Sequence, residues 1–373
     1  MTGPKPTLFI VDGSIAVTGA LVSAARQAEL LRDEVDTILV LPRGHRVPTA
    51  RTAAFAEVIE LPIVNLRKSL ASLILYGPSL IAASVMLWRA MRRRECERLQ
   101  LNDFYLAHGA MLRLLGFRGR IVTFVRIDPT RFGIAGVAWL TAARWYSTEL
   151  VAVSRFIQRL LQPAYPSRLV YEHVTPGKVG DGPAASRPPI LLFVGNYIEG
   201  KGQEDAIEAF HRIAARYPAA RLRFVGGDMG LAKNRQFRAA LEQATAVSRA
   251  PQRIEFRGHS DDLTADYAEA FAALNFSASE SFSNTCLDAS AAGLAVVATR
   301  CGGPEEIIDD GVTGFLVPVG DVAAMAERLV WLLDHPDETR AMGEAGRRLV
   351  DERFSPERSK MALLKALGLA EGG

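Results

Sequence analysis

Short apolar runs alternate with stretches of helical periodicity along the whole chain. In the first half they predict strands at residues 8–11, 37–41, 121–124 and 150–153, with a helix over 20–31. In the second half they predict strands at 190–194, 222–225, 254–256, 273–276 and 295–298, with helices from about 203 and over 285–292. Continuous apolar runs are typical of strands that helices cover on both faces. The pattern therefore predicts an α/β protein with doubly wound parallel sheets.

One break in composition divides this alternation. Residues 175–189, TPGKVGDGPAASRPP, are rich in Gly, Pro, Ala and Ser, which is typical of a domain boundary. We expect a first domain over 1–175, a linker over 176–189, a second domain over 190–355 and a last helix within 356–373. Ligands of doubly wound sheets bind beyond the carboxyl ends of the strands, so we expect a ligand cleft between the two domains.

The composition excludes several classes of protein. The 373 residues are 49% hydrophobic and 23% charged, with a formal net charge of +3, which argues against a general nucleic-acid binder. Three cysteines form no CxxC pair and no disulfide framework, and the six histidines show no zinc-like clustering. The N-terminus runs almost directly into a strand without a secretory signal. We therefore expect a cytoplasmic protein.

The segment from Ser69 to Trp88 contains 20 residues without a charge, which is long enough to cross a bilayer. Gly77-Pro78 interrupts it, and basic residues flank it on both sides, within 67–98. Three interpretations stay open: a pair of core helices, a surface lying on an anionic membrane, and a transmembrane helix.

Two glycine-bearing loops follow predicted strands in the second half. Residues 193–202, FVGNYIEGKG, place backbone amides and Lys201 at a helix start, where an anion is favoured. The alternative is an ordinary loop with an exposed lysine. Residues 224–228, FVGGD, include Gly226, whose lack of a side chain lets the backbone approach a ligand closely. The alternative there is a simple tight turn.

The segment 279–293, SESFSNTCLDASAAG, carries two carboxylates around a helix start. Glu280 lies in the loop after a strand, and Asp288 lies one or two turns into the next helix. Between them, the amides and small polar groups of 281–285 suit a phosphate, while carboxylates suit the vicinal hydroxyls of a sugar or a ribose. The alternative is a helix cap with a surface acid. A double glycine at 302–303 follows the next strand, where Glu305 and Glu306 brace the loop.

These segments occur in one order, and together they resemble the donor-binding half of retaining glycosyltransferases of family 4, which have the two-Rossmann-domain GT-B fold. The resemblance rests on FVGNYIEGKG, RLRFVGGD, IEFRG, SESFSNTCLDASAAG, AVVATRCGGPEE and GVTGFLVP across 190–355. The first half resembles the family more loosely, through GSIAVTGA, the AHG at 107–109 and AVSRFIQRLL. In this fold the last helix commonly returns to the first domain.

The resemblance implies a role for each matching residue. Glu280 would bind a hydroxyl of the donor sugar, Asp288 the ribose, and Lys201 the diphosphate. The loop from Arg257 to His259 would lie along the base of the nucleotide. The residues implied to catalyse are Lys201, Glu280 and Arg126; those implied to bind the donor are Gly19, Asn196, Gly226, Arg257, His259, Ser281, Phe282, Ser283, Asn284, Thr285 and Asp288.

Three positions depart from the family pattern. Asn196 stands where the family has an arginine on the diphosphate, and Asp288 where it has a glutamate. Arg126 stands where the family often has a histidine beside the donor sugar. We expect Arg126 to compensate for the arginine that is missing at 196.

The resemblance implies transfer of a hexosyl group, with retention, from a UDP- or GDP-sugar to a glycan or lipid-linked acceptor, in bacterial surface polysaccharide or glycolipid synthesis. We expect no cofactor and no metal ion, because no DxD motif lies in a suitable loop. Two alternatives remain: a non-catalytic sugar-nucleotide-binding or assembly protein, and a nucleotide-sugar epimerase. A dinucleotide oxidoreductase is disfavoured, since no GxGxxG follows the first strand. Contact with the inner face of the cell membrane through 67–98 is a further expectation.

Overall fold

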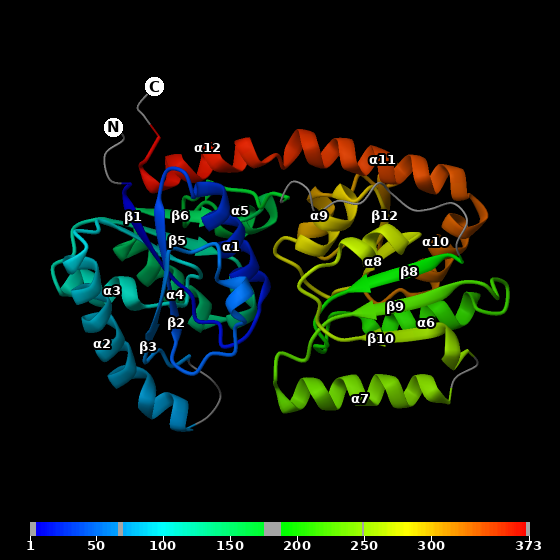
Figure 1. The fold of residues 1–373 in the computed structure, drawn as a ribbon, viewed down its shortest axis with the longest axis horizontal. Coiled ribbons are helices and arrows are strands. Elements are labelled where there is room, and N and C mark those ends of the chain that lie inside the picture. Colours follow the sequence, from blue (N-terminus) through cyan, green and yellow to red (C-terminus); the bar gives the residue numbers. More distant parts are fainter. Residues whose placement is uncertain (1–4, 66–69, 175–187, 248–249, 371–373) are drawn as a thin grey trace. The chain divides into compact units, whose positions relative to one another are not determined.

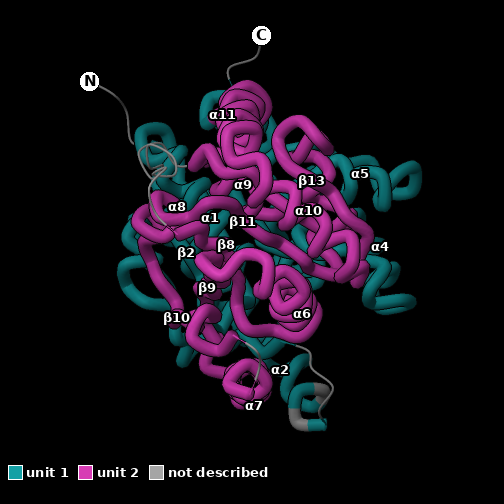
Figure 2. Tube along the Cα trace, turned by 90° about the vertical axis from the view of Figure 1, so that its right-hand side faces the viewer, with its two compact units in different colours: residues 1–172, 356–373 teal, residues 173–355 magenta. Residues whose placement is uncertain are grey.

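The computed structural model describes residues 5–65, 70–174, 188–247 and 250–370. The chain divides into two compact units, residues 1–172 with 356–373 (unit 1) and residues 173–355 (unit 2), which Figure 2 shows in different colours. The predicted linker, 176–189, lies outside the described residues except for its last two positions. Each unit is built around one parallel sheet (Figure 1).

Unit 1 holds a seven-stranded sheet with the order β3-β2-β1-β4-β5-β6-β7, in which every neighbouring pair is parallel. Its strands are β1 (Thr7–Val11), β2 (Asp36–Pro42), β3 (Glu57–Leu61), β4 (Arg98–Leu101), β5 (Arg120–Val125), β6 (Glu149–Ala152) and β7 (Arg168–Leu169). Its helices are α1 (Gly19–Leu31), α2 (Leu70–Arg93), α3 (His108–Leu114), α4 (Ile134–Tyr146), α5 (Arg155–Leu161) and α12 (Pro356–Leu367), with short 3-10 turns at Thr49–Arg51 and Pro129–Phe132.

The helices of unit 1 cover both faces of its sheet. The crossovers through α2, α3 and α4 all run from β3 towards β6, whereas α1 leads from β1 towards β2 in the opposite direction. Because parallel crossovers are right-handed, α2, α3 and α4 share one face and α1 lies on the other. Contacts join α2 to α3 and α3 to α4, and α12 packs on α1 and β5. The C-terminal helix thus belongs to unit 1.

The uncharged segment forms one helix, α2, with Pro78 inside it. The expectation of a pair of helices broken at Gly77-Pro78 is therefore wrong. The expectation of core helices is also wrong, because only 22% of the most apolar stretch of α2, residues 74–93, is buried within the protein. This helix is long and apolar enough to cross a membrane by length and composition. Its buried side, Ala83, Leu87 and Met91, packs within unit 1.

Unit 2 holds a six-stranded parallel sheet with the order β10-β9-β8-β11-β12-β13. Its strands are β8 (Ile190–Val194), β9 (Arg221–Val225), β10 (Ile254–Arg257), β11 (Ala272–Asn275), β12 (Ala295–Thr299) and β13 (Gly314–Val317). Its helices are α6 (Gln203–Ile213), α7 (Ala232–Ala246), α8 (Thr264–Glu269), α9 (Asn284–Ala291), α10 (Val322–Asp334) and α11 (Pro336–Arg353), with 3-10 turns at Pro251–Arg253 and Gly303–Glu306.

The core of unit 2 lies between its sheet and helices packed on it. Ala206, Ile207, Phe210 and Ile213 of α6 are buried at the spacing that the sequence predicts. Helix α10 packs beside α6, and α11 packs on α9 and β12. Because both sheets are buried by helices, their strands consist of the continuous apolar runs seen in the sequence.

The predicted strands are confirmed to within one or two residues, whereas β3, β4, β7 and β13 were not predicted. Strand β3 reads EVIEL, with glutamates at positions that are exposed in the sheet, and β7 has two residues. Strand β4 reads RLQL and contains a buried glutamine. Of these four strands only β13, GFLV, is a continuous apolar run, which is the signal that identified the others.

Candidate active site

The strand order of unit 2 reverses between β8 and β11. Successive connections from β8 move to β9 and β10 on one side, while β11 lies on the other side of β8. Ligands of doubly wound sheets bind where the strand order reverses in this way, beyond the carboxyl ends of the strands. The loops that leave this point, 195–202 and 276–283, contain the two residues with the strongest predicted roles, Lys201 and Glu280.

Lys201 and Glu280 form an ion pair at this point. The Nζ of Lys201 lies 2.7 Å from Oε1 of Glu280, and the same oxygen accepts a hydrogen bond of 2.8 Å from Ser277 Oγ. The side chains are 33% and 15% exposed, so the pair borders solvent. The two residues that the sequence assigns to opposite ends of a sugar diphosphate are therefore in contact with each other.

The backbone of both residues is held in place. The amide of Glu280 donates to the carbonyl of Cys301 at 3.1 Å, and its carbonyl accepts from Gly303 at 2.7 Å, so the loop pairs with the segment after β12. The amide of Ala278 donates to Gly200 at 2.9 Å, which ties the two site loops together. The ion pair is therefore a consequence of fixed loops.

Gly202 makes the close approach of these loops possible. It caps α6 with φ +84°, and a Cβ at this position would lie 2.1 Å from the carbonyl oxygen of Phe276. A side chain is excluded on both grounds. The glycine next to Lys201 thus brings the start of α6 against the end of β11.

The helix start after Glu280 is capped by its own side chains. Ser283 accepts from the amide of Cys286 at 3.3 Å, and Asn275 donates to the hydroxyls of Ser283 and Thr285 at 2.9 and 3.1 Å. These hydroxyls hold the helix in place, so their availability to a ligand is reduced. The backbone amides of the first turn of α9 lie at the start of the helix, where an anion is favoured. They are the anion-binding groups that this segment offers.

The side chain of Phe282 is buried, whereas that of Asp288 is half-buried. The ring of Phe282 is buried and packs edge-on against Phe354 with 5.6 Å between ring centres. The expectation that Phe282 binds the donor is therefore restricted to its backbone. Asp288 lies on α9, four residues after Asn284 and half-buried, which places both on one side of the helix. Ser281 is half-buried in the loop before the cap.

Asn196 and Gly226 hold two adjacent loops together. The Oδ1 of Asn196 accepts from the amide of Gly227 at 3.2 Å, and its carbonyl accepts from Gln203 Nε2 at 2.9 Å. A Cβ at Gly226 would lie 1.9 Å from the carbonyl oxygen of Gly195. The interpretation that Gly226 frees the backbone for a ligand is corrected: the space is occupied by the neighbouring loop.

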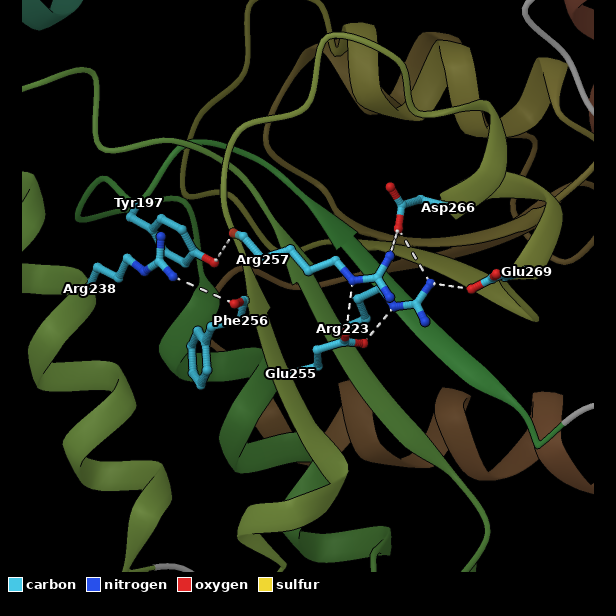
Figure 3. A network of polar contacts seen from close by, with 8 residues as sticks. All are labelled: Tyr197, Arg223, Arg238, Glu255, Phe256, Arg257, Asp266 and Glu269. Carbon is cyan, nitrogen blue, oxygen red and sulfur yellow. Dashed lines mark hydrogen bonds and ion pairs between the residues drawn. The ribbon is translucent and has the colours of Figure 1, made fainter.

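Arg257 lies at the end of β10 in a network of ion pairs (Figure 3). Its guanidinium contacts Glu255 at 2.7 Å and Asp266 at 2.8 Å, and the adjacent Arg223 contacts both of these acids and Glu269. Its backbone carbonyl accepts from Tyr197 Oη at 3.0 Å, on the opposite side of the residue (Figure 3). The guanidinium of Arg257 is already paired with two carboxylates of the protein. The predicted contact with the nucleotide base therefore depends on the backbone of Arg257 and on His259.

His259 is exposed in the loop after β10. Its Nε2 lies 3.2 Å from Asp261, two residues further along the loop. Its Cβ lies 3.2 Å from the position that a side chain at Gly227 would take, so this loop approaches the one after β9. The predicted role of His259 at the base stays a prediction.

Two of the predicted site residues, Gly19 and Arg126, belong to unit 1 and lie in segments that follow strands of its sheet. Gly19 is the first residue of α1, after β1, and a Cβ there would meet no heavy atom within 4 Å. Packing does not require this glycine, which is consistent with an approach by a ligand. Arg126 follows β5 and is buried, with a side chain that is 5% exposed.

Arg126 is neutralised inside unit 1. Its guanidinium forms a short ion pair with Glu172, donates from Nε to Asn102 Oδ1 at 2.8 Å, and stacks over Phe124 at 4.5 Å. The expectation that it replaces the missing arginine at 196 is therefore corrected, because its charge is already balanced by a buried carboxylate.

A buried polar cluster around Arg126 was missed by the sequence analysis. It contains Asp12 after β1, Asn102 and Asp103 after β4, and Glu172 near β7. Asn102 donates to Asp12, and Asp103 accepts from the amides of Phe104 and Arg126. A signal existed, since polar residues directly follow two strands at the reversal between β1 and β4; it was lost because β4 itself was not predicted.

Burial shifts two titratable groups near this cluster. Burial raises the pKa of Asp103 to about 7, against the opposing effect of two backbone amides that donate to its carboxylate. Burial lowers the pKa of His108 to about 4, and neither of its ring nitrogens has a hydrogen-bond partner in the part of the chain that the structure describes. Among the described residues, no group of three or more His, Cys, Asp and Glu side chains could hold a metal ion.

Comparison with known proteins assigns the second half of the chain. Residues 188–335 match the model of the family glycosyl transferases group 1. The matched segment contains Lys201, Glu280 and the loops that hold them.

Curated relatives match about half of the chain. The chain is 31% identical over 169 residues to the N-acetyl-alpha-D-glucosaminyl L-malate synthase of Bacillus anthracis, which covers 45% of this chain and 42% of that protein. It is 28% identical over 231 residues to a GDP-mannose-dependent monoacylated alpha-(1-6)-phosphatidylinositol monomannoside mannosyltransferase of Corynebacterium glutamicum, covering 56% and 58%. The matches thus span about half of the relatives' length.

Solved structures match nearly the whole chain. Anabaena Alr3699/HepE in complex with UDP-glucose superimposes with a TM-score of 0.83 at 17% identity, covering 98% of this chain and 100% of that one. Sucrose-phosphate synthase from Thermosynechococcus elongatus gives 0.78 at 18% identity, covering 97% and 98%. These matches establish the GT-B fold that the sequence predicts.

Proposed function

We propose that this group 1 protein transfers a hexosyl group from a nucleotide diphosphate sugar to an acceptor hydroxyl, with retention of configuration. The observation that carries the proposal is the contact between Lys201 and Glu280 at the β8–β11 reversal. A cation and a carboxylate at this point suit a ligand with an anionic end and a hydroxyl-bearing end.

Donor binding would replace the ion pair by contacts to the donor. The ammonium group of Lys201 would move from Glu280 to the diphosphate, and the released carboxylate would accept hydrogen bonds from sugar hydroxyls. The amides at the start of α9 would add partial positive charge at the phosphates. Asp288, on the same side of α9 as Asn284, would bind the ribose.

The transfer step breaks the bond between the anomeric carbon and the diphosphate oxygen, and the bonding electrons stay with the diphosphate. The acceptor oxygen forms a new bond to the same carbon on the same face, and its proton passes to the departing phosphate. Lys201 and the α9 amides stabilise the negative charge where it develops. Because Lys201 and these amides supply the positive charge that balances the diphosphate, we propose that transfer needs neither a metal ion nor a cofactor.

The relatives suggest donors and acceptors. One is GDP-mannose-dependent and acts on a phosphatidylinositol mannoside, one is a lipopolysaccharide core biosynthesis glycosyltransferase of Rhizobium meliloti, and HepE is bound to UDP-glucose. We infer a UDP- or GDP-hexose as donor and a glycan or lipid-linked acceptor, in surface polysaccharide or glycolipid synthesis. The site of action would be the cytoplasm, at the inner face of the cell membrane, with contact through 67–98.

A thermal-shift screen of the full chain against UDP-, GDP-, ADP- and dTDP-sugars tests the proposal. A ligand that binds the folded protein raises its melting temperature by mass action, and we expect this from one of the first two classes. Transfer to a lipid-linked acceptor would then be followed by NMR of the anomeric proton, with and without EDTA. No shift with any donor, or conversion of the donor without an acceptor, would contradict the proposal; the second result identifies an epimerase.

A further inference from the structure

Helices α2, α3 and α4 of unit 1 form one layer on one face of the sheet. Contacts join α2 to α3 and α3 to α4. Arg113 of α3 donates to the carbonyl of Tyr146, the last residue of α4, at 2.9 Å, which fixes the two helices to each other. All three helices belong to unit 1.

The layer carries much of the exposed apolar surface of the protein. Of the 15 large apolar side chains that are exposed among the described residues, ten lie between 70 and 145. On α2 they include Leu70, Ile74 and Ile81. On α4, Ile134, Val137 and Trp145 are 90%, 58% and 63% exposed. Apolar exposure on this scale is typical of an interaction surface.

The charges of the layer have one sign. None of the three helices contains Asp or Glu, whereas Arg89, Arg92 and Arg93 are exposed on α2 and Arg144 is exposed on α4. The next arginine, Arg94, is paired with Glu57 at 2.8 Å and is not part of this surface charge. Apolar side chains beside cations without carboxylates match the chemistry of an anionic lipid surface.

Helix α2 packs against the rest of unit 1. The amide of Val64, after β3, donates to Ser79 Oγ in the middle of the helix at 2.9 Å, and Ser79 donates to the carbonyl of Pro62. Ala83, Leu87 and Met91 on its inner side are buried. A helix held along its length in this way is part of the domain, which disfavours a transmembrane span.

We propose that the α2–α3–α4 layer lies on an anionic bilayer, with Ile134, Val137 and Trp145 of α4 inserted beside the apolar side of α2. This extends the membrane surface beyond segment 67–98, to a helix that the sequence did not implicate. A second copy of the chain is a poorer occupant, because a symmetric interface would bring the arginines of two identical layers together. The layer would present unit 1 to acceptors in the membrane, a consequence that rests on the proposed function.

The test uses the full chain and vesicles of phosphatidylcholine with or without 30% phosphatidylglycerol. We expect co-sedimentation with the anionic vesicles, which decreases as salt rises. The double variant Ile134→Ser/Val137→Ser should reduce partitioning by about tenfold or more, because two exposed aliphatic side chains lose their contact with lipid. The matched control is Val247→Ser/Val312→Ser, which removes two comparably exposed valines from unit 2 and should leave partitioning unchanged.

Trp145 gives a second readout. Its fluorescence should shift to shorter wavelength with anionic vesicles, and Trp145→Phe should lose most of that shift. Unchanged partitioning of the α4 double variant would overturn the proposal. So would a wild-type dimer in sedimentation equilibrium that the double variant converts to a monomer. The donor-induced rise in melting temperature, measured on the same variants, reports separately on the proposed function and should persist.

Discussion

Lys201 Nζ lies 2.7 Å from Glu280 Oε1, although the two residues are 79 positions apart in the sequence. Each is a counter-charge of the other. Under the proposed function a diphosphate would compete with Glu280 for the lysine, and release of the carboxylate would make it available to the sugar. Binding of the two ends of a donor would thus be coupled through one contact.

Substitution of Lys201 by alanine should weaken donor binding and lower turnover by about 100-fold or more, the scale of losing a group that stabilises developing charge. Isothermal titration and initial rates with the donor measure both effects. Lys233→Ala, at an exposed lysine of α7, is the matched control. Wild-type kinetics in Lys201→Ala would show that the phosphate is bound elsewhere.

Glu280→Gln should have opposite effects on binding of the free nucleotide and on the rate of transfer. Free UDP or GDP should bind about fivefold more tightly, because Lys201 loses a competing carboxylate in a partly exposed pair worth about 1 kcal/mol. Transfer should fall by about 100-fold, since the hydroxyl contact is lost. Glu344→Gln on α11 serves as the control. Weaker binding of the free nucleotide would argue against competition for the lysine.

Asn196→Arg should restore the positive charge that the family pattern places at this position. We expect about tenfold tighter binding of the free nucleoside diphosphate, the scale of one charge-assisted hydrogen bond. The variant also loses the acceptor for the Gly227 amide, at a cost of about 1 kcal/mol in the free energy of unfolding. Asn196→Ala loses the same hydrogen bond without adding a charge, so equal affinities of the two variants would refute a phosphate contact at 196.

Substitutions of Arg126 and Glu172, which form a buried ion pair, should have strongly non-additive effects on the free energy of unfolding. Either Arg126→Met or Glu172→Leu leaves one buried charge without its partner, which costs about 3–5 kcal/mol. The double variant should be more stable than the sum of the two losses predicts, by 2 kcal/mol or so in urea unfolding. Additive losses would mean that the two side chains do not depend on each other. Activity of the folded double variant tests whether Arg126 has any catalytic role.

Asp103 and His108 should give opposite pH dependences of stability. The pKa of Asp103 is raised to about 7, so between about pH 4 and 7 the folded state holds a proton that the unfolded state has lost, and stability falls as pH rises. The pKa of His108 is lowered to about 4, so between about pH 4 and 6.5 the unfolded state holds the extra proton, and stability rises with pH.

The two slopes cancel over their shared range, and single substitutions should reveal them. Asp103→Asn leaves the His108 contribution, so the free energy of unfolding should rise from pH 4 to 6.5 by roughly 1.4 kcal/mol per pH unit. His108→Leu leaves the Asp103 contribution, so it should fall over pH 4 to 7. Urea unfolding at several pH values measures both. Identical pH profiles for wild type and both variants would show that neither group titrates as described.

The sequence by itself determined the strands that are continuous apolar runs, except β13, together with the start of α6 at Gln203 and the residues that α6 buries. It also determined the GT-B fold, through motifs whose order follows the strands. These features depend on local periodicity and on residues close together in the chain, so a linear pattern contains them. The strands with polar residues, β3, β4 and β7, were missed for the same reason.

The tertiary structure alone decided which distant residues meet. It brought Lys201 to Glu280, gave Arg126 a buried partner in Glu172, and filled the space beside Gly226 with the neighbouring loop. It also turned one side of α2 outward, together with α4. Each of these outcomes depends on which elements pack against one another, and a residue's periodicity does not specify the neighbour that packing will supply.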